Sequence, residues 1–137
     1  GNSKMGKSLG NAIYLSDTPD EVWNKIRNAK TDTNRISVKI PGNPELCSVY
    51  QYHKAFNSEG VEEVCSACKN AQMGCVACKK LLNEKMNAIM DPIREKRHFY
   101  EEHKDMVRDI ISEGTKKANE IGNRNIAEIK EKMHVII

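Results

Sequence analysis

Residues Thr18–Lys30 read TPDEVWNKIRNAK and contain the clearest helix start in the chain. Thr18 is a suitable N-cap residue, Pro19 fits the first helical position, and Glu21 completes a T-x-x-E capping box. Four apolar residues then recur at helical spacing, at Val22, Trp23, Ile26 and Ala29. This spacing predicts a helix from Pro19 to about Lys30 that buries one face.

Similar periodicity downstream predicts further helices over about residues 48–56, 61–71 and 75–90, and one that begins near residue 104 and extends over nearly thirty residues. Pro92 is expected to kink the third of these without ending it, because the helical rhythm continues to residue 100. Its expected buried stripe comprises Leu81, Leu82, Met86, Ile89 and Met90. Residues 31–45 form a connector with Pro41, Gly42 and Pro44, and its alternating residues 36–40 are expected to be extended and partly docked. The predicted fold class is all-α, a helical bundle.

The composition excludes several classes of protein. The 137 residues fit one compact domain, and 30% of them are charged, with a formal net charge of +3. So small a net charge indicates nucleic-acid binding only if the basic residues cluster. No apolar run approaches the roughly 20 residues of a membrane span. No secretory signal opens the chain, so no membrane partner is predicted.

The cysteines carry the densest chemistry, in the pairs Cys65-x2-Cys68 and Cys75-x2-Cys78. An odd total of 5 cysteines, without an export signal, favours a metal site or free thiols over a disulfide framework. Each pair can project both sulfurs from one helical turn. On the residues alone, zinc on these four thiolates is the default, an iron–sulfur cluster is possible, and small buried apolar side chains are the minority alternative. None of the 4 histidines has a convincing partner by spacing.

Before the first helix, residues Lys4–Asp17 read KMGKSLGNAIYLSD. Glycine leaves this backbone mobile, and the ammonium groups of Lys4 and Lys7 are placed to reach the same anion. Lysine, a point charge on a flexible stem, suits a phosphate that moves during a reaction. Taken alone, K-x-x-K-S is a weak signal, and a solvated basic loop is the commoner explanation.

The longer run, however, resembles the K-M-S-K-S signature of class I aminoacyl-tRNA synthetases. Its continuation, L-G-N-x-I-x-L-x-D, is most similar to the tryptophanyl-tRNA synthetases. The resemblance continues through Thr18–Pro19, Ala29–Asp32, Tyr52–Phe56, Gly74–Lys80 and Asp91–Arg97. Gly6 stands where the family usually has serine, which removes a hydroxyl group and loosens the loop but leaves both lysines and Ser8.

This resemblance implies the C-terminal part of a tryptophan–tRNA ligase. Residues 1–16 would form the flexible catalytic loop and the end of a nucleotide-binding domain, and residues 17–137 an α-helical anticodon-binding domain. Lys4 and Lys7 would be catalytic and, with Ser8, would bind the phosphates of ATP, assisted by magnesium. The implied partners are tryptophan, ATP, the anticodon stem-loop of tRNA(Trp) and a second subunit of a homodimer, in the cytoplasm. Without its nucleotide-binding domain, this chain alone would be inactive.

The same resemblance changes the metal prediction, because some tryptophanyl-tRNA synthetases carry a four-iron–four-sulfur cluster. The implied ligands are Cys47, Cys68, Cys75 and Cys78. Cys65 would be a spare or alternative ligand, and zinc the alternative metal.

Two other functions stay open. One is a stand-alone tRNA- or metal-binding helical module without catalysis. The other is the tyrosine-specific cousin, against which the motifs after Asp17 argue.

Basic residues gather on the long helix predicted from residue 75. They are Lys79, Lys80, Lys85, Arg94, Lys96 and Arg97, followed by His98. By themselves such residues are typical of a solvated face. The resemblance implies that some of them position tRNA phosphates while other groups read the bases.

Overall fold

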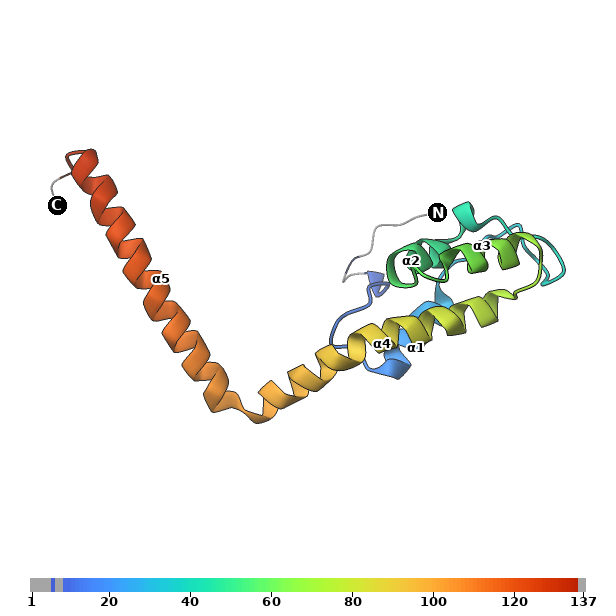
Figure 1. The fold of residues 1–137 in the computed structure, drawn as a ribbon, viewed down its shortest axis with the longest axis horizontal. Helices are drawn as coiled ribbons and strands as arrows, with labels where there is room; N and C mark the ends of the chain where they lie inside the picture. The colour runs from blue at the N-terminus through green and yellow to red at the C-terminus, as the bar shows by residue number, and fades with distance from the viewer. Residues whose placement is uncertain (1–5, 7–8, 136–137) are drawn as a thin grey trace. The chain divides into compact units, whose positions relative to one another are not determined.

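A computed structural model describes residue 6 and residues 9–135, and it confirms the all-α prediction: this part of the chain holds helices and no strand. The elements, shown in Figure 1, are α1 (Pro19–Asn28), the 3-10 helix η2 (Pro44–Leu46), α2 (Ser48–Phe56), α3 (Val61–Lys69), α4 (Cys75–Glu102) and α5 (Lys104–Lys132). The chain divides into two compact units, residues 1–94 and 95–137.

Helix α1 begins as its sequence predicts. The Thr18 hydroxyl oxygen accepts a hydrogen bond from the Glu21 backbone N–H at 3.3 Å, and the Glu21 carboxylate accepts one from the Thr18 N–H at 2.8 Å. The helix ends near Asn28, where Lys79 Nζ of α4 donates to the carbonyl oxygens of Arg27 and Ala29, both at 2.7 Å. A cation at a helix C-terminus satisfies carbonyls that lack intrahelical partners. Lys79 therefore joins the end of α1 to α4.

The core of the first unit is formed by one face of each of three helices. It consists of Val22 and Ile26 from α1, Val49 from α2, and Leu82, Met86 and Met90 from α4. Figure 1 shows α2 and α3 lying along the first part of α4. The prediction that Ile89 belongs to the buried stripe is wrong, since 48% of its surface is exposed. The core residues of α4 recur every four positions, and Ile89 lies beside this row.

The connector does not form the extended segment expected over residues 36–40. Its backbone turns instead, with the Ile40 N–H donating to the Ser37 carbonyl at 3.1 Å. Ile36 is 87% exposed and is therefore not docked. Asp32 accounts for part of this geometry, because its carboxylate accepts the backbone N–H groups of Asn34 at 2.9 Å and Asn43 at 2.8 Å. One buried carboxylate thus closes the connector into a loop.

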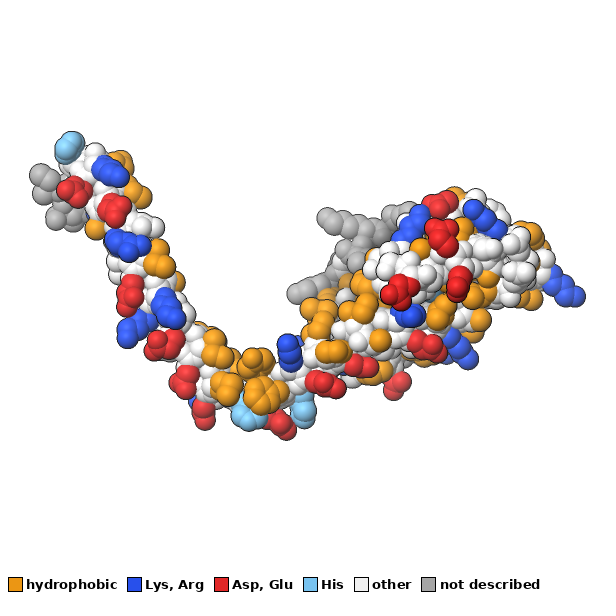
Figure 2. Space-filling model, viewed as in Figure 1, with side chains coloured by type: hydrophobic (Ala, Val, Ile, Leu, Met, Phe, Trp, Pro, Cys, Tyr) orange, Lys and Arg blue, Asp and Glu red, His pale blue; other side chains and the backbone are white. Residues whose placement is uncertain are grey.

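Helix α4 runs through Pro92 without ending, and α5 begins at Lys104, both as predicted. No residue of α5 within the described part of the chain is buried. The isoleucines that recur along it are exposed, for example Ile110 at 57% and Ile121 at 52%. Figure 2 shows these hydrophobic side chains interspersed with charged ones along the helix. Across the described residues, each helix is too short or too polar to span a membrane.

Candidate functional site

The end of the predicted catalytic loop, residues 9–17, is called the loop tail and is held in place by hydrogen bonds between its own polar groups and Gly6. The Gly6 N–H donates to Asn11 Oδ1 at 3.0 Å, and the Leu9 N–H donates to the Gly6 carbonyl at 3.1 Å. Gly10 follows with a φ of +61°, a left-handed conformation that glycine adopts without strain. Three predicted site residues lie outside the described part of the chain: Lys4, Lys7 and Ser8.

Asp17 lies between this loop tail and α1 and is only 5% exposed. Its Oδ2 atom accepts the Tyr14 N–H at 2.8 Å and Lys25 Nζ at 2.5 Å. Lys25 Nζ also lies 4.6 Å from the centre of the Tyr14 ring, in a cation–π contact. Burial raises the pKa of Asp17, but the bonds from Lys25 and Tyr14, with the charges of Lys25 and Arg94, outweigh it and lower the pKa. Asp17 is therefore ionised and holds the loop tail against α1.

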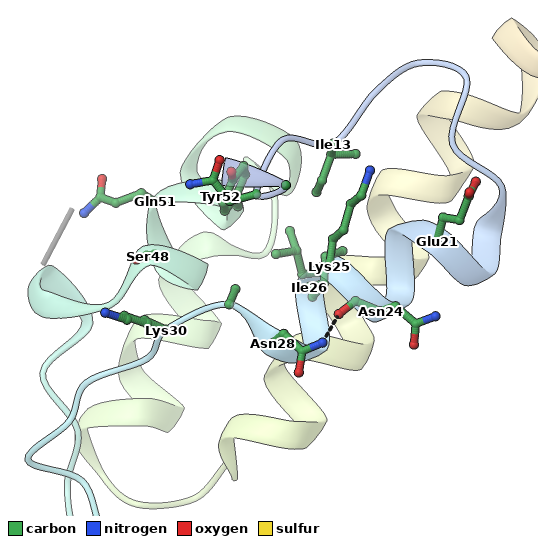
Figure 3. Close-up of a pocket in the computed structure, with 14 residues that line it drawn as sticks. Ile13, Glu21, Asn24, Lys25, Ile26, Asn28, Lys30, Ser48, Gln51 and Tyr52 are labelled. Carbon is green, nitrogen blue, oxygen red and sulfur yellow. Dashed lines mark hydrogen bonds between the residues drawn. The ribbon is translucent and has the colours of Figure 1, made fainter. Parts of the chain in front are cut away.

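A cavity of about 710 Å³ opens beside the loop tail, between α1, the start of the connector, α2 and α4. In Figure 3, Ile13 and Lys25 border it on one side and Gln51 and Lys30 on the other. Its lining also includes apolar surface from Ile26 and polar groups from several asparagines. A mixture of apolar walls and a few polar groups is typical of sites that receive a ligand or another segment of protein.

Four of the five cysteines influence one another electrostatically. Burial and the charges of Cys47, Cys68 and Cys75 raise the pKa of Cys78 to about 12, against an opposing contribution from Arg35. Burial likewise raises the pKa of Cys68, opposed by Arg35 and assisted by Cys47 and Cys75. All five cysteines are free. Among the described residues, however, no group of three or more His, Cys, Asp or Glu side chains is arranged to hold a metal ion.

The connector wraps around Cys68. Arg35 Nη1 lies 3.7 Å from the Cys68 sulfur, and Arg35 Nε donates to the Ile40 carbonyl at 2.7 Å. The Gly42 N–H donates to the Cys68 carbonyl at 3.0 Å. A Cβ atom at Gly42 would lie only 2.6 Å from the Cys68 sulfur, so this close approach requires glycine. The guanidinium group of Arg35 opposes the rise in the pKa of Cys68 but does not outweigh the effect of burial.

Cys65 has a different partner. Its thiol is hydrogen-bonded to the Tyr50 side chain, and this bond, with burial and nearby negative charges, raises the pKa of Tyr50 to about 12. Cys47, Cys68 and Cys75 thus affect the pKa of Cys78, whereas Cys65 is engaged with Tyr50 of α2.

His53 is fully buried and lies beside Cys78. Its Nε2 lies 3.2 Å from the Cys78 carbonyl oxygen and 3.4 Å from the Cys78 sulfur, and its Nδ1 lies 3.1 Å from Asn57 Nδ2. Burial lowers the pKa of His53, against a backbone hydrogen bond at Cys78 that raises it. The sequence pattern did not reveal this role, although His53 follows the buried Val49 by one helical turn.

The family model "tRNA synthetases class I (W and Y)", the enzymes for tryptophan and tyrosine, matches residues 1–91. The chain belongs to this family. The match extends from the loop through α1, the connector, α2 and α3 to most of the first unit's part of α4.

Individual relatives of this synthetase chain are named for tryptophan. The chain is 43% identical to the tryptophan–tRNA ligase of Borreliella burgdorferi over 96% of its length and 38% of the relative's. It is 34% identical to that of Aquifex aeolicus, again over 96% of its own length and 34% of the relative's. The solved tryptophanyl-tRNA synthetase of Campylobacter jejuni, complexed with ADP and tryptophan, aligns with a TM-score of 0.84 at 27% identity. That alignment covers 97% of this chain and 41% of the solved one. The chain therefore spans between about a third and two fifths of the length of these relatives.

Several contacts in this synthetase chain escaped the sequence analysis. Sequence patterns placed Asp17 at the end of the loop signature, and Arg94 in the Asp91–Arg97 match and the basic run, without a contact for either. Asp17 and Lys25 form an ion pair but lie eight positions apart in the sequence. This spacing differs from the three or four positions of a helical pair, so it does not indicate the contact. Arg94 donates to the Asp17 carbonyl from 77 residues away, so no local pattern indicates it.

Proposed function

We propose that this chain is part of a tryptophan–tRNA ligase, which activates tryptophan with ATP and transfers it to tRNA(Trp). The match to the class I family model over residues 1–91, which includes the loop Lys4–Asp17, carries the proposal. The names of the relatives favour tryptophan over tyrosine as the amino acid. In this proposal the chain supplies the phosphate-binding loop and the anticodon-recognising helices, and the nucleotide-binding domain is provided by other residues of the enzyme.

The proposed first step is an in-line attack by the tryptophan carboxylate on the α-phosphorus of ATP. The bond to the bridging oxygen breaks, and pyrophosphate leaves with the electron pair, giving tryptophanyl-adenylate. Lys4 and Lys7 would stabilise the charge that grows on the pyrophosphate, and the Ser8 hydroxyl would donate to a phosphate oxygen. Magnesium bound to the nucleotide would neutralise part of the same charge. In the second step, the terminal ribose hydroxyl of the tRNA displaces AMP and takes the tryptophanyl group.

Recognition of the anticodon stem-loop would use exposed cations on the helices. Arg97, whose side chain is 57% exposed and bridges to Glu101, is available to a phosphate. Lys80 and Lys85 are exposed as well. Phosphate contacts of this kind fix the register of an RNA, while base contacts provide specificity. The homodimer and the cytoplasmic location that the resemblance implies belong to this proposal.

Tryptophan-dependent exchange of pyrophosphate into ATP tests the proposal in the full-length enzyme that carries this chain. Lys4→Ala and Lys7→Ala should each lower the rate of exchange by roughly 100-fold, the usual cost of removing one group that stabilises transition-state charge. Tryptophan binding should change little, because the lysines act on the phosphates. Lys116→Ala, which removes an exposed lysine of α5, is the control and should leave the rate unchanged.

The same assay separates the alternatives. Exchange that depends on tyrosine would favour the tyrosine-specific cousin. A full-length protein that binds tRNA but exchanges no pyrophosphate would be a binding module. Full exchange activity in both lysine variants would remove the role assigned to the loop.

We also propose, from the donor chemistry alone, that Cys47, Cys68, Cys75 and Cys78 bind a four-iron–four-sulfur cluster, with zinc as the alternative. Thiolates are the ligands of both. The raised pKa values of Cys68 and Cys78 favour the protonated thiols in the metal-free protein, so metal binding would release their protons. The described side chains are not arranged as a metal site, so no step of the reaction is derived through a metal.

Anaerobic purification followed by iron, acid-labile sulfide and zinc analysis tests the metal proposal. Cys47→Ser and Cys78→Ser should lose the metal, whereas Cys65→Ser should retain it, because Cys65 is engaged with Tyr50. A colourless protein with stoichiometric zinc would replace the cluster by zinc. A protein that purifies without iron or zinc under these conditions would refute both.

A further inference from the structure

Arg94 belongs to a run of basic residues, yet its guanidinium group contacts four residues within the described part of the first unit. Its side chain is only 17% exposed. Its Nη1 donates to the Asp91 carboxylate at 2.6 Å, and its Nη2 donates to Asn87 Oδ1 at 2.8 Å and lies 3.8 Å from Met90 Sδ. Three side chains of α4 therefore hold the planar guanidinium group in one orientation.

That orientation directs Nε away from its own helix. Arg94 Nε donates to the main-chain carbonyl of Asp17 at 2.8 Å, which joins α4 to the end of the loop tail across 77 residues of sequence. The same aspartate uses its carboxylate to accept Lys25 of α1 and the Tyr14 N–H of the tail. Asp17 is thus held by α4 through its backbone and by α1 through its side chain.

Two separate bonds at one residue restrict the chain more than either bond alone, because they fix the direction of the backbone as well as its position. Upstream of Asp17, the tail is turned by the bonds of Tyr14 with Asp17 and of Gly6 with Leu9 and Asn11. Arg94 and Lys25 therefore tie Asp17, the last residue of the tail, to α4 and to α1.

We propose that Arg94 is a positioning residue for adenylate formation: it holds the Asp17 carbonyl and thereby anchors the tail, residues 9–17, that follows Lys4 and Lys7 in the sequence. The inference rests on the proposed function and adds to it a residue that touches no substrate. Small displacements of a catalytic group lower rates steeply, about 100-fold for roughly 1 Å. Loss of Arg94 should therefore be felt in the chemical step.

The test uses Arg94→Gln and Arg94→Lys in the full-length enzyme, with Arg108→Gln as the matched control. Arg108 makes the same pair with an aspartate three residues earlier, Asp105 at 2.9 Å, but its side chain is 78% exposed. Two measurements are made on each variant. Hydrogen–deuterium exchange reports the amides of residues 9–17, and tryptophan-dependent pyrophosphate exchange reports the reaction.

In Arg94→Gln, the amide hydrogens of Tyr14 and Asp17 should exchange with solvent at least about tenfold faster than in the parent enzyme. The kcat of pyrophosphate exchange should fall by roughly 10- to 100-fold, while the KM for tryptophan stays nearly unchanged. Arg94→Lys keeps the charge and can still reach one acceptor, so its amide exchange and its kcat should lie between those of Arg94→Gln and the parent enzyme. It also allows the measurement if Arg94→Gln does not fold. Arg108→Gln should match the parent enzyme in both measurements.

A double-mutant cycle with Lys7→Ala distinguishes positioning from mere structural support. If Arg94 acts through the loop lysines, Arg94→Gln should cost much less in the Lys7→Ala enzyme than in the parent. An equal cost in both backgrounds, or unchanged amide exchange in a folded Arg94 variant, would overturn the inference. A parent enzyme with no tryptophan-dependent exchange would refute the proposed function and the catalytic part of this inference, while amide exchange would still decide whether Arg94 anchors the tail.

Discussion

Asp17→Asn should destabilise the first unit by about 2 kcal/mol at pH 7. The substitution preserves the size of the side chain and an oxygen that can accept the Tyr14 N–H, but it removes the charge that holds Lys25. A hydrogen bond between charged groups contributes about 1.5–3 kcal/mol, and breaking a fully buried ion pair costs about 3–5 kcal/mol. Lys25 keeps a side-chain exposure of 24% and recovers part of its hydration, which places the expected cost in the lower range.

The dependence of this cost on pH has a defined sign. The pKa of Asp17 in the folded chain is below its ordinary value of 3.8. As the pH falls, the unfolded chain therefore binds the proton first, and protonation favours unfolding. The stabilisation by Asp17 is fully present well above pH 3.8 and is lost as the pH falls through 3.8 toward the folded pKa. The difference between parent and Asp17→Asn should therefore shrink below about pH 4.

Urea unfolding followed by tryptophan fluorescence provides the measurement. The chain has 1 tryptophan, Trp23, which lies in α1 and reports the first unit. Glu45→Gln is the control, because Glu45 pairs with Lys54 at the surface with a side-chain exposure of 63%. Exposed pairs contribute about 0–1 kcal/mol. Equal stability of parent and Asp17→Asn at pH 7, or a difference that persists undiminished at pH 3, would refute the ionised anchor.

Three further substitutions test the packing of the first unit by the same urea assay. Thr18→Ala should cost about 0.5–2 kcal/mol through loss of the N-cap of α1, and a smaller effect on Thr18→Gly would support the capping bond as the cause. Leu82→Ala should cost about 2–5 kcal/mol, since Leu82 is 0% exposed, whereas Ile89→Ala at 48% exposure should cost much less; equal losses would contradict the assigned core. Gly42→Ala should cost about 1–3 kcal/mol, because the added Cβ would lie 2.6 Å from the Cys68 sulfur, and unchanged stability would show that the connector can move away at little cost.

Local signals predicted the helices well. The T-x-x-E box at Thr18 places the start of α1 at the observed residue, and periodicity carries α4 through Pro92. The connector was predicted less well, because alternation over residues 36–40 does not produce a strand when no neighbouring strand is available to pair with it. There the hydrogen bonds of Asp32 and Arg35 to other connector residues determine the backbone, and Arg35 also contacts Cys68 of α3.

In the candidate site too, the sequence indicated some of the residues, and the structure alone revealed others. Spacing and resemblance selected Cys47, Cys68, Cys75 and Cys78 as metal ligands, but among the described residues no three His, Cys, Asp or Glu side chains are arranged to hold a metal ion, and the ligand set stays a prediction. The pairing of Cys65 with Tyr50 and the burial of His53 depend on how α2 packs against its neighbours. Neither follows from spacing alone. The positions of the loop lysines stay a prediction.

The basic run on α4 shows why charge patterns alone cannot locate an RNA surface. Lys79 and Arg94 were grouped with the other cations of this helix, yet Lys79 caps α1 and Arg94 holds Asp17. Long cationic side chains can turn inward wherever backbone carbonyls at the end of a helix or turn lack partners. In this chain both inward-turned cations bind main-chain oxygens of the first helix or the tail before it. These two cations therefore contribute to the fold and the loop, and any phosphate surface on α4 must be formed by the remaining exposed cations.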